Sequence, residues 1–363
     1  MKRVVGFLVL VWLWLPVGVI TAESQESDLS ISFTALSRPI WALGFEDAKW
    51  LLPGKRSPPI RIAFLPLSNT TKRSQEAHSN ELEGERTTRM GAWSRAIPMY
   101  LAERVWVTTD AIADVYLFVV EGKGVALLDS PVSEEMLATV LEKADAEERP
   151  ALIITGTTAI DVSGLRSRID LTLWEVRNST TILRQTIGAQ SLLESSAELA
   201  LEVEAKLLTI LENYGIRRQE ELQKEFPAPS RDDFVIEGYL YNLETVMLQS
   251  LVQWGEFPSD FLYGEDNMFE SYLWLCQAMP EAVTPRLTFL RALVAATKYG
   301  STAHEPHIPL AEQWLAEASD QEPIGKLAPF VLRTLGKSEA FEQRRNELMK
   351  TAEGVYKVWL EKL

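Results

Sequence analysis

The spacing of apolar residues changes once along this chain, near residue 215, and this change limits the folds that the chain can adopt. Before residue 215, short runs rich in β-branched and aromatic residues alternate with segments of helical spacing. From about residue 232 onward, only helical spacing remains. Apolar residues at every second position indicate strands, and a repeat near 3.6 indicates helices. The sequence therefore predicts an α+β domain, with a mixed sheet and helices, followed by an all-α domain of helical hairpins.

The α+β part begins with a predicted strand at residues 60–65, which are rich in β-branched and aromatic residues and precede a proline. Helical spacing follows, and Pro98 within it predicts a bent helix because proline has no amide hydrogen to donate. Short strands are expected at 105–108 and 115–120. Ser133 is expected to cap a second helix, since two acids follow it in the first turn.

A meander of three strands and a long helix close this part of the chain. The strands are expected at 152–154, 168–173 and 183–187. In the second strand apolar and polar residues alternate, so one face of the sheet is expected to contact solvent. The helix is expected from 192 to 213, with Ser191 and Glu194 as a capping box and Gly215 as its end.

The second half of the chain is expected to contain only helices. The predicted helices span 234–254, 268–279, 284–299, 309–319, 324–335 and 338–360. Most of the connections between them are short, which favours antiparallel helical hairpins. The chain is thus divided into an α/β domain at 60–215 and a helical domain at 216–363.

The N-terminus has the composition of an export signal. Lys2 and Arg3 precede an apolar run over 4–20, and Ala22 is a small residue before the first acid. We expect a signal peptide at 1–22 that is removed, and hence a periplasmic protein. The alternative is an uncleaved anchor in the inner membrane, because a run of about 17 apolar residues is at the lower limit for crossing a bilayer.

Residues 23–59 are expected to form a linker between this signal and the first domain. The segment begins with a polar stretch and ends in a run rich in proline and glycine at 53–59. One short helical piece is expected within it, at 46–52.

Charge and cysteine content exclude several classes of protein. The formal net charge is −15, and an acidic surface of this kind repels nucleic acid and anionic lipid headgroups. We therefore expect no nucleic-acid partner, and membrane contact only through a retained signal. Cys276 is the one cysteine, so neither an internal disulfide nor a lipid anchor beside the signal is possible. The core alone must stabilise the fold.

No catalytic, cofactor or metal site is predicted. The three histidines are His78, His304 and His307. The last two are three residues apart with Pro306 between them, whereas the helical zinc motif needs a spacing of four. Cys276 lies in an apolar stretch and is expected to be buried, so no nucleophile with an adjacent base is apparent.

Paired carboxylates remain an open possibility in the helical half. The acids considered are Asp232, Asp233, Glu265, Asp266 and Glu270. A glycan hydrolase needs two carboxyl groups facing each other across a cleft, and spacing along the chain does not show this arrangement. Runs of acids are more often solvated faces.

The densest cluster of aromatic residues lies between 254 and 274 and is the candidate partner surface. Its proposed members are Trp254, Phe257, Phe261, Tyr263 and Phe269. Aromatic side chains anchor many binding interfaces. The competing interpretation is the core of a helical hairpin, because Phe269, Tyr272 and Trp274 lie at or near helical spacing.

The order of elements over 60–213 resembles the TolB N-terminal-like domain family of bacterial envelope proteins. The similarity lies in 60–67 (IRIAFLPL) for the first strand, in 154–157 (ITGT) and 165–174 (LRSRIDLTLW) for the meander, and in 183–190 (LRQTIGAQ) before the closing helix. The resemblance implies a noncatalytic periplasmic α/β module that makes protein contacts. Unlike TolB itself, this chain lacks the strand repeats of a β-propeller.

The helical half is weakly similar to tetratricopeptide hairpins. The similarity lies in 310–318 (LAEQWLAEA) and in 327–336, which combine small and aromatic residues. No self-similarity with a period of 34 residues accompanies it. A degenerate helical-repeat domain is the resulting expectation.

The sequence as a whole predicts a noncatalytic periplasmic adaptor or scaffold that binds other cell-envelope proteins. Two alternatives stay open. One is an assembly component of an outer-membrane machine of the flagellar or export type, which an exposed apolar patch or sheet edge would favour. The other is a carboxylate-dependent hydrolase of an envelope polymer, which two acids with raised pKa values in one cleft would favour.

Overall fold

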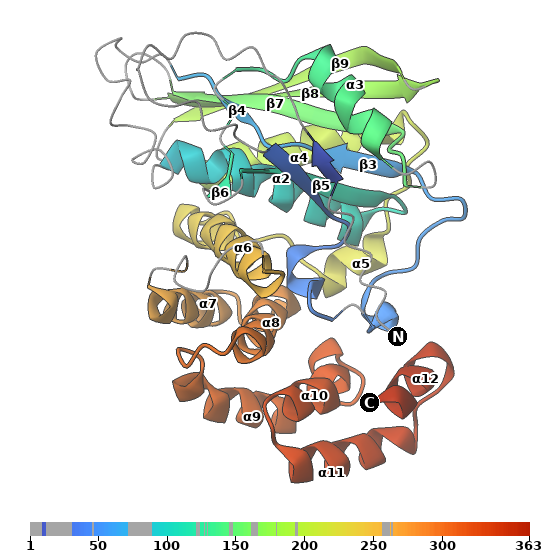
Figure 1. Cartoon of the computed structure of the whole chain (residues 1–363), viewed down its shortest axis with the longest axis vertical. Helices are drawn as coiled ribbons and strands as arrows, with labels where there is room; N and C mark the ends of the chain where they lie inside the picture. Colours follow the sequence, from blue (N-terminus) through green and yellow to red (C-terminus); the bar gives the residue numbers. More distant parts are fainter. Residues whose placement is uncertain are drawn as a thin grey trace.

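The computed structural model shows a mixed sheet with helices followed by a helical region, as the sequence predicts (Figure 1). The structure describes residues 9–11, 31–45, 47–71, 89–120, 124–126, 128, 130–144, 148–160, 166–178, 180–192, 195–255, 262 and 264–363. The predicted signal peptide at 1–22, apart from residues 9–11, lies outside this part of the chain. Among the described helices, none is long and apolar enough to cross a membrane.

The described strands form one mixed sheet. They are β1 (Val9–Val11), β2 (Ile31–Leu36), β3 (Arg61–Phe64), β4 (Ser68–Asn69), β5 (Ile112–Val120), β6 (Gly124–Val125), β7 (Leu152–Ile160), β8 (Arg166–Arg177) and β9 (Thr180–Leu192). Their order is β1-β2-β5-β3-β7-β8-β9, with β4 beside β7 and β6 beside β5. Strand β3 is parallel to β5 and β7, whereas β8 and β9 continue the sheet as an antiparallel meander. The predicted meander is confirmed.

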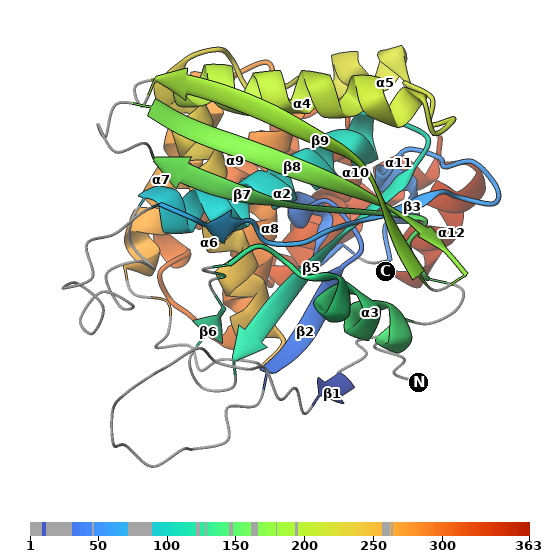
Figure 2. The same ribbon diagram turned by 90° about the horizontal axis from the view of Figure 1, so that it is seen from above.

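Apart from α3, the helices lie in successive layers below the sheet in Figure 1. They are α2 (Arg89–Thr108), α3 (Glu134–Lys143), α4 (Ser196–Glu212), α5 (Glu220–Glu225), α6 (Asp233–Gln253), α7 (Glu265–Ala278), α8 (Val283–Tyr299), α9 (Ile308–Glu317), α10 (Pro323–Thr334), α11 (Ser338–Met349) and α12 (Gly354–Lys362). Helices α2 and α4 cover one face of the sheet, and α3 covers part of the other (Figure 2). Helices α6 to α8 form the next layer, and α9 to α12 the farthest.

Several local predictions are confirmed and others are wrong. Ser133 caps α3, because its hydroxyl accepts a hydrogen bond from the amide of Met136. The strand expected at 105–108 is instead the last turn of α2, since its apolar residues continue the helical face buried against the core. The predicted capping box of α4 does not form. Ser191 lies in β9 and its hydroxyl donates to Glu198, while Glu194 is outside the described residues.

The helix expected at 338–360 is two helices, α11 and α12. The break falls before Gly354, whose φ of +55° is a left-handed conformation that glycine adopts without strain. Two helices with a turn between them allow α12 to fold back onto α11, and the two pack together. The other five predicted helices, α6 to α10, lie within three residues of their predicted bounds, and α5 was not predicted.

The predicted linker at 23–59 is wrong for residues 31–45 and 47–52, here called the strap. Its first part is β2, which pairs antiparallel with β5 along six residues. Beyond β2, short 3-10 helices η1 (Ile40–Ala42) and η2 (Lys49–Leu51) run across the helical half. Apolar strap side chains are buried in the core, and the indole of Trp41 stacks on Phe226 at 5.3 Å between ring centroids. The strap is therefore a structural element that contacts both halves of the molecule.

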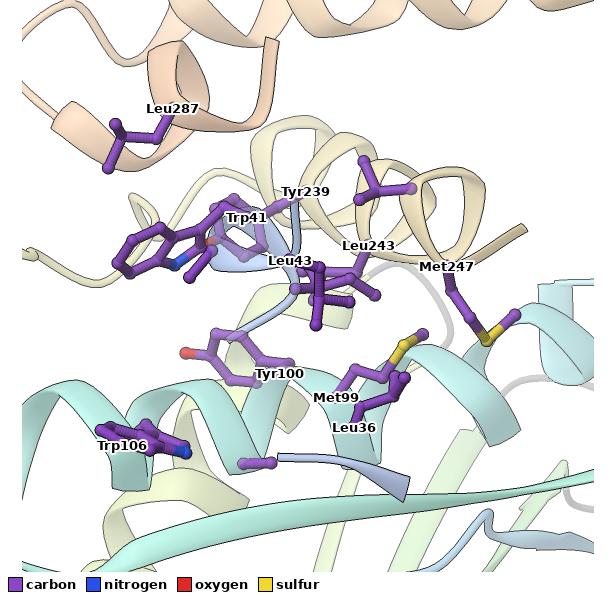
Figure 3. Close-up of a cluster of buried hydrophobic side chains, with 14 of the residues drawn as sticks. Leu36, Trp41, Leu43, Met99, Tyr100, Trp106, Tyr239, Leu243, Met247 and Leu287 are labelled. Atoms are coloured by element: carbon purple, nitrogen blue, oxygen red, sulfur yellow. The ribbon is translucent and has the colours of Figure 1, made fainter. Parts of the chain in front are cut away.

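Sheet and helical half share one hydrophobic core. Figure 3 shows Trp41 and Leu43 of the strap between Tyr239 of α6 and Tyr100 of α2. The same cluster extends from Ile62 in the sheet to the last helices. A smaller core lies between the opposite face of the sheet and α3. Because the large core is continuous, the strap and the helical half complete the burial of α2 and α4, the helices that pack against the sheet.

Candidate functional site

Strand β9 forms one edge of the sheet and is the candidate site for protein contacts (Figure 2). It is 13 residues long and pairs with β8 from Thr180 to Leu192. No described strand pairs with its other side. The unpaired backbone groups of an edge strand are able to bind a further strand, and protein partners use such edges.

Two large aliphatic side chains are exposed near the start of β9. Ile182 is 39% exposed and Leu183 is 52% exposed. Ile182 lies opposite Glu175 on β8, and Leu183 lies opposite Trp174. Successive strand residues point to opposite faces, so this edge offers aliphatic surface on both faces of the sheet. An irregularity in pairing between Leu173 and Trp174 increases the local twist of the strands there.

A cluster of charges lies beside these aliphatic residues. Glu175 accepts a hydrogen bond from Arg177 and forms an ion pair with Arg184, with Nε 2.7 Å from Oε2. The hydrogen bond from Arg177 lowers the pKa of Glu175, and the charges of both arginines lower it further. Glu175 is thus ionised at neutral pH. Two guanidinium groups share this one carboxylate, and this leaves positive charge beside Ile182 and Leu183.

A groove of about 500 Å³ runs between β9 and α4. Ile187, Ala205 and Ile210 contribute apolar surface to it. Lys206 of α4 donates to the carbonyl of Gly188 at 2.7 Å and so fixes the position of the helix against the edge strand. A side chain of a strand added at this edge would contact both the apolar wall of the groove and the ammonium group of Lys206. The edge, the aliphatic pair, the charge cluster and the groove together form the β9 edge site.

Of the five residues proposed as an aromatic partner surface, the structure describes Trp254 and Phe269. Trp254, at the C-terminal end of α6, is exposed. Phe269 is buried in α7 and contacts Phe289 and His307, with ring centroids 6.3 Å and 5.2 Å away. Phe269 is therefore part of the core, as in the competing interpretation. Phe257, Phe261 and Tyr263 lie outside the described residues.

The sulfur and imidazole groups show no catalytic arrangement within the described part of the chain. Burial raises the pKa of the Cys276 thiol to about 12, so it is protonated at neutral pH and a poor nucleophile. His304 bonds to the hydroxyl of Thr297 at 2.9 Å, and burial lowers its pKa. His307 stacks on Phe269. The described residues contain no group of three His, Cys, Asp or Glu side chains that could hold a metal ion.

Three of the five candidate acids have structural hydrogen bonds. Asp232 caps α6 by accepting from the amide of Phe234 at 2.8 Å. Asp233 accepts from the amide of Ala197 at 2.7 Å, at the start of α4. Glu265 accepts from the hydroxyls of Tyr299 and Ser301. These carboxylates stabilise helix ends and helix contacts, while Asp266 and Glu270 are exposed on α7.

The sequence did not reveal a set of buried ionisable groups where α2 meets α4 and α6, here called the junction. Arg104 donates from Nε to Glu204 at 2.9 Å, and Tyr100 donates to the same carboxylate. Tyr239 donates to Glu103. The pKa of Glu103 is raised to about 7. Burial is the largest cause and the charge of Glu204 adds to it, while the hydrogen bond from Tyr239 and the charge of Arg104 act in the opposite direction. One guanidinium therefore serves two buried carboxyl groups.

The two carboxyl groups with raised pKa values do not share a cleft. Glu103 is enclosed at the junction, and its second oxygen has no hydrogen-bond partner among the described residues. Asp114 lies on β5 beside Arg61, and burial raises its pKa to about 6. The sequence gave no indication that Glu103 and Asp114 are buried, because acidic residues within helical and strand patterns usually face solvent.

No protein family model, no curated protein and no solved structure matches the chain. The resemblance of residues 60–213 to the TolB N-terminal-like family therefore stays a prediction.

Proposed function

We propose that this protein is a noncatalytic adaptor of the bacterial cell envelope that binds an extended segment of a partner protein along β9. The observation that carries the proposal is the unpaired side of a 13-residue edge strand with two exposed aliphatic residues. The envelope location rests on the N-terminal export signal read from the sequence.

The composition of β9 supports binding at this edge. Proteins usually protect edge strands with proline, lysine, inward charges or very short length. Strand β9 is long, contains no proline or lysine, and has one charged residue, Arg184, which is paired with Glu175. An added strand would gain backbone hydrogen bonds along the part of this edge before Gly188, whose carbonyl already accepts from Lys206, and its alternate side chains would determine specificity.

The surroundings of the edge indicate the chemistry of the partner segment. Ile182 and Leu183 favour aliphatic side chains opposite them, because burial of apolar surface is the main driving force of association. Arg177 and Arg184 favour an acidic side chain nearby, because the single carboxylate of Glu175 neutralises only one of these two cations. We therefore expect an extended segment that combines aliphatic and acidic residues.

Site-specific photo-crosslinking in intact cells tests the proposal. A photoreactive amino acid at Leu183 should give an adduct with an envelope protein, because the residue lies on the proposed contact edge. The matched control is Phe234, which is a large exposed residue on α6, away from β9. Adducts at both positions alike, or at neither, would contradict the proposal.

A charge substitution gives a second measurement of the same contact. The double variant Ile182→Lys, Leu183→Lys should lose co-purification of the crosslinked partner, because two cations would replace the aliphatic surface. Phe234→Lys should retain it. Circular dichroism of both variants establishes that they fold, since all three positions are exposed.

A permanent subunit of an outer-membrane machine is the second candidate function, and the same exposed sheet edge favours it. Such a subunit would remain in a complex of fixed stoichiometry after detergent extraction, whereas an adaptor would exchange between bound and free states. The ratio of protein to partner in the extracted complex, measured with and without crosslinking, separates the two.

A further inference from the structure

A second surface lies at the end of the molecule opposite the sheet, where the strap meets α8, α10 and α12 (Figure 1). These segments enclose a cavity of about 620 Å³. A volume of this size is typical of sites for small molecules. The cavity is separate from the β9 edge site, and the inference drawn from it is independent of the proposed function.

Basic side chains surround this cavity. Lys49 of the strap, Lys298 of α8, Arg333 of α10 and Lys362 of α12 line it, and Asp47 is the one acidic side chain among the lining residues. In a chain with a formal net charge of −15, this is a local concentration of positive charge. Clefts lined by one sign of charge attract ligands of the opposite sign. The cavity therefore favours an anion.

The remaining wall of the cavity is apolar. Phe330 and Trp359 line it, with ring centroids 6.4 Å apart. On α12, Val355 is 63% exposed and Val358 is 50% exposed, and both face the same cavity. Exposed aliphatic side chains beside aromatic rings and cations indicate a ligand that has an apolar part as well as a charge.

Trp359 is a fixed part of the apolar wall. Trp359 is buried, and its indole N–H has no acceptor among the described residues. Trp50 of the strap packs edge-on against both Trp359 and Tyr356, with ring centroids 5.3 Å and 5.0 Å away, and so holds α12 in place. Because this N–H is itself inaccessible, Trp359 offers the cavity a ring surface and not a hydrogen-bond donor.

We propose that this basic cavity binds a small organic dianion, a phosphate monoester on an apolar carrier. Several cations around one cavity favour a doubly charged group over a single carboxylate. Arg333 donates to a main-chain oxygen of Leu363, which fixes its position, and a guanidinium has further N–H groups for a phosphate. The apolar carrier would lie against Phe330, Trp359 and the exposed valines of α12.

Isothermal titration calorimetry of the full chain with phenyl phosphate tests the proposal. The double variant Lys49→Gln, Lys362→Gln removes two exposed cations of the cavity and should raise the dissociation constant at least tenfold. The matched control is Lys350→Gln, Lys357→Gln, which removes two exposed lysines nearby that do not line the cavity. It should leave the dissociation constant unchanged.

Trp359→Phe tests the aromatic part of the cavity wall, because it keeps an aromatic ring and removes part of the ring surface. It should weaken phenyl phosphate binding severalfold while circular dichroism shows an intact fold. Equal binding by the Lys49, Lys362 double variant and the native protein would overturn the site, as would the absence of any binding.

The ligand class is tested with three further probes. Inorganic phosphate and phenol should each bind more weakly than phenyl phosphate, since each offers only one half of the ligand. Inorganic phosphate binding as tightly as phenyl phosphate would overturn the apolar carrier. Binding to vesicles of phosphatidylglycerol without binding to phenyl phosphate would overturn the small-molecule proposal in favour of a membrane surface.

Discussion

Charged side chains are buried and paired at the junction, whereas at the far end of the helical half they are exposed around the basic cavity. At the junction, the side chain of Arg104 is 5% exposed and that of Glu204 is 10% exposed. A second pair, Arg95 with Glu244, lies between α2 and α6 at 2.8 Å. Around the cavity, Lys49, Lys362 and Arg333 are all exposed.

The difference shows how burial decides what the same residue types do. Desolvation of two charges is costly, so a buried pair fixes a geometry and is strongly disrupted when one member is lost. Exposed cations keep their hydration and contribute little to stability, but their field is available to an incoming anion. The junction is therefore expected to control stability, and the basic cavity is expected to tolerate substitution.

The largest expected effect is that of Arg104→Met. This substitution leaves the buried carboxylate of Glu204 without its cation and the carbonyl of Phe226 without its donor. It should lower the free energy of unfolding at pH 7 by about 3 to 5 kcal/mol. Urea unfolding followed by circular dichroism measures the change.

Protonation of Glu103, whose pKa in the folded protein is raised to about 7, removes one buried negative charge at low pH, so the deficit of Arg104→Met should shrink at pH 5. Glu202→Gln is a matched control on α4, because Glu202 forms an exposed ion pair with Lys206. It should change stability by less than about 1 kcal/mol. A deficit of the same size in both variants would mean that burial is not what distinguishes the junction.

An intermediate effect is expected from Glu103→Gln, and it depends on pH. Burial raises the pKa of Glu103 in the folded protein to about 7, from an ordinary value of 4.5. Between these values the folded state holds a proton that the unfolded state has released, so stability falls as pH rises. The loss from pH 4.5 to pH 7 is on the order of 3 kcal/mol.

Glu103→Gln should remove this part of the pH dependence and make the variant more stable than the native protein at pH 8. Asp114, whose pKa is raised to about 6, contributes a smaller slope that both proteins should retain. Parallel urea titrations from pH 5 to pH 8 test this. Curves for variant and native protein that stay parallel throughout would rule out Glu103 as the titrating group.

The smallest expected effect is that of Arg333→Met at the basic cavity. Arg333 is exposed and donates to a main-chain oxygen of Leu363, so its loss should change the free energy of unfolding by less than about 1 kcal/mol. The same chemical change thus has a large effect on stability at Arg104 and a small one at Arg333. A loss above about 3 kcal/mol at Arg333 would show that the cavity is part of the structural framework.

The sequence predicted elements whose pattern is local. The strand at 60–65, the three-strand meander and most of the later helices have apolar residues at regular spacing, and the structure contains them. The division of 338–360 into two helices was missed because Gly354 is a single residue within a helical pattern. Glycine is only mildly unfavourable in a helix, so its position gives a weak indication of a break.

The strap and the β9 edge site could not be predicted, because both depend on distant partners. Residues 31–45 and 47–52 lack a long regular pattern, and their order comes from burial against α6, α8 and α10. Ile182 and Leu183 belong to a strand that the sequence does predict. Whether a strand lies at an edge depends on the order of strands in the sheet, which the pattern of a single strand does not contain.

The strap also has a consequence for the order in which the chain assembles. The guanidinium of Arg291 donates to the carbonyl of Leu43 across a separation of 248 residues. Long-range contacts of this kind form late, because much of the intervening chain must first be ordered. The core near the N-terminus therefore stays incomplete until α8 has been synthesised. Slow closure keeps the chain unfolded for longer, which suits the passage through a membrane channel that the proposed export requires.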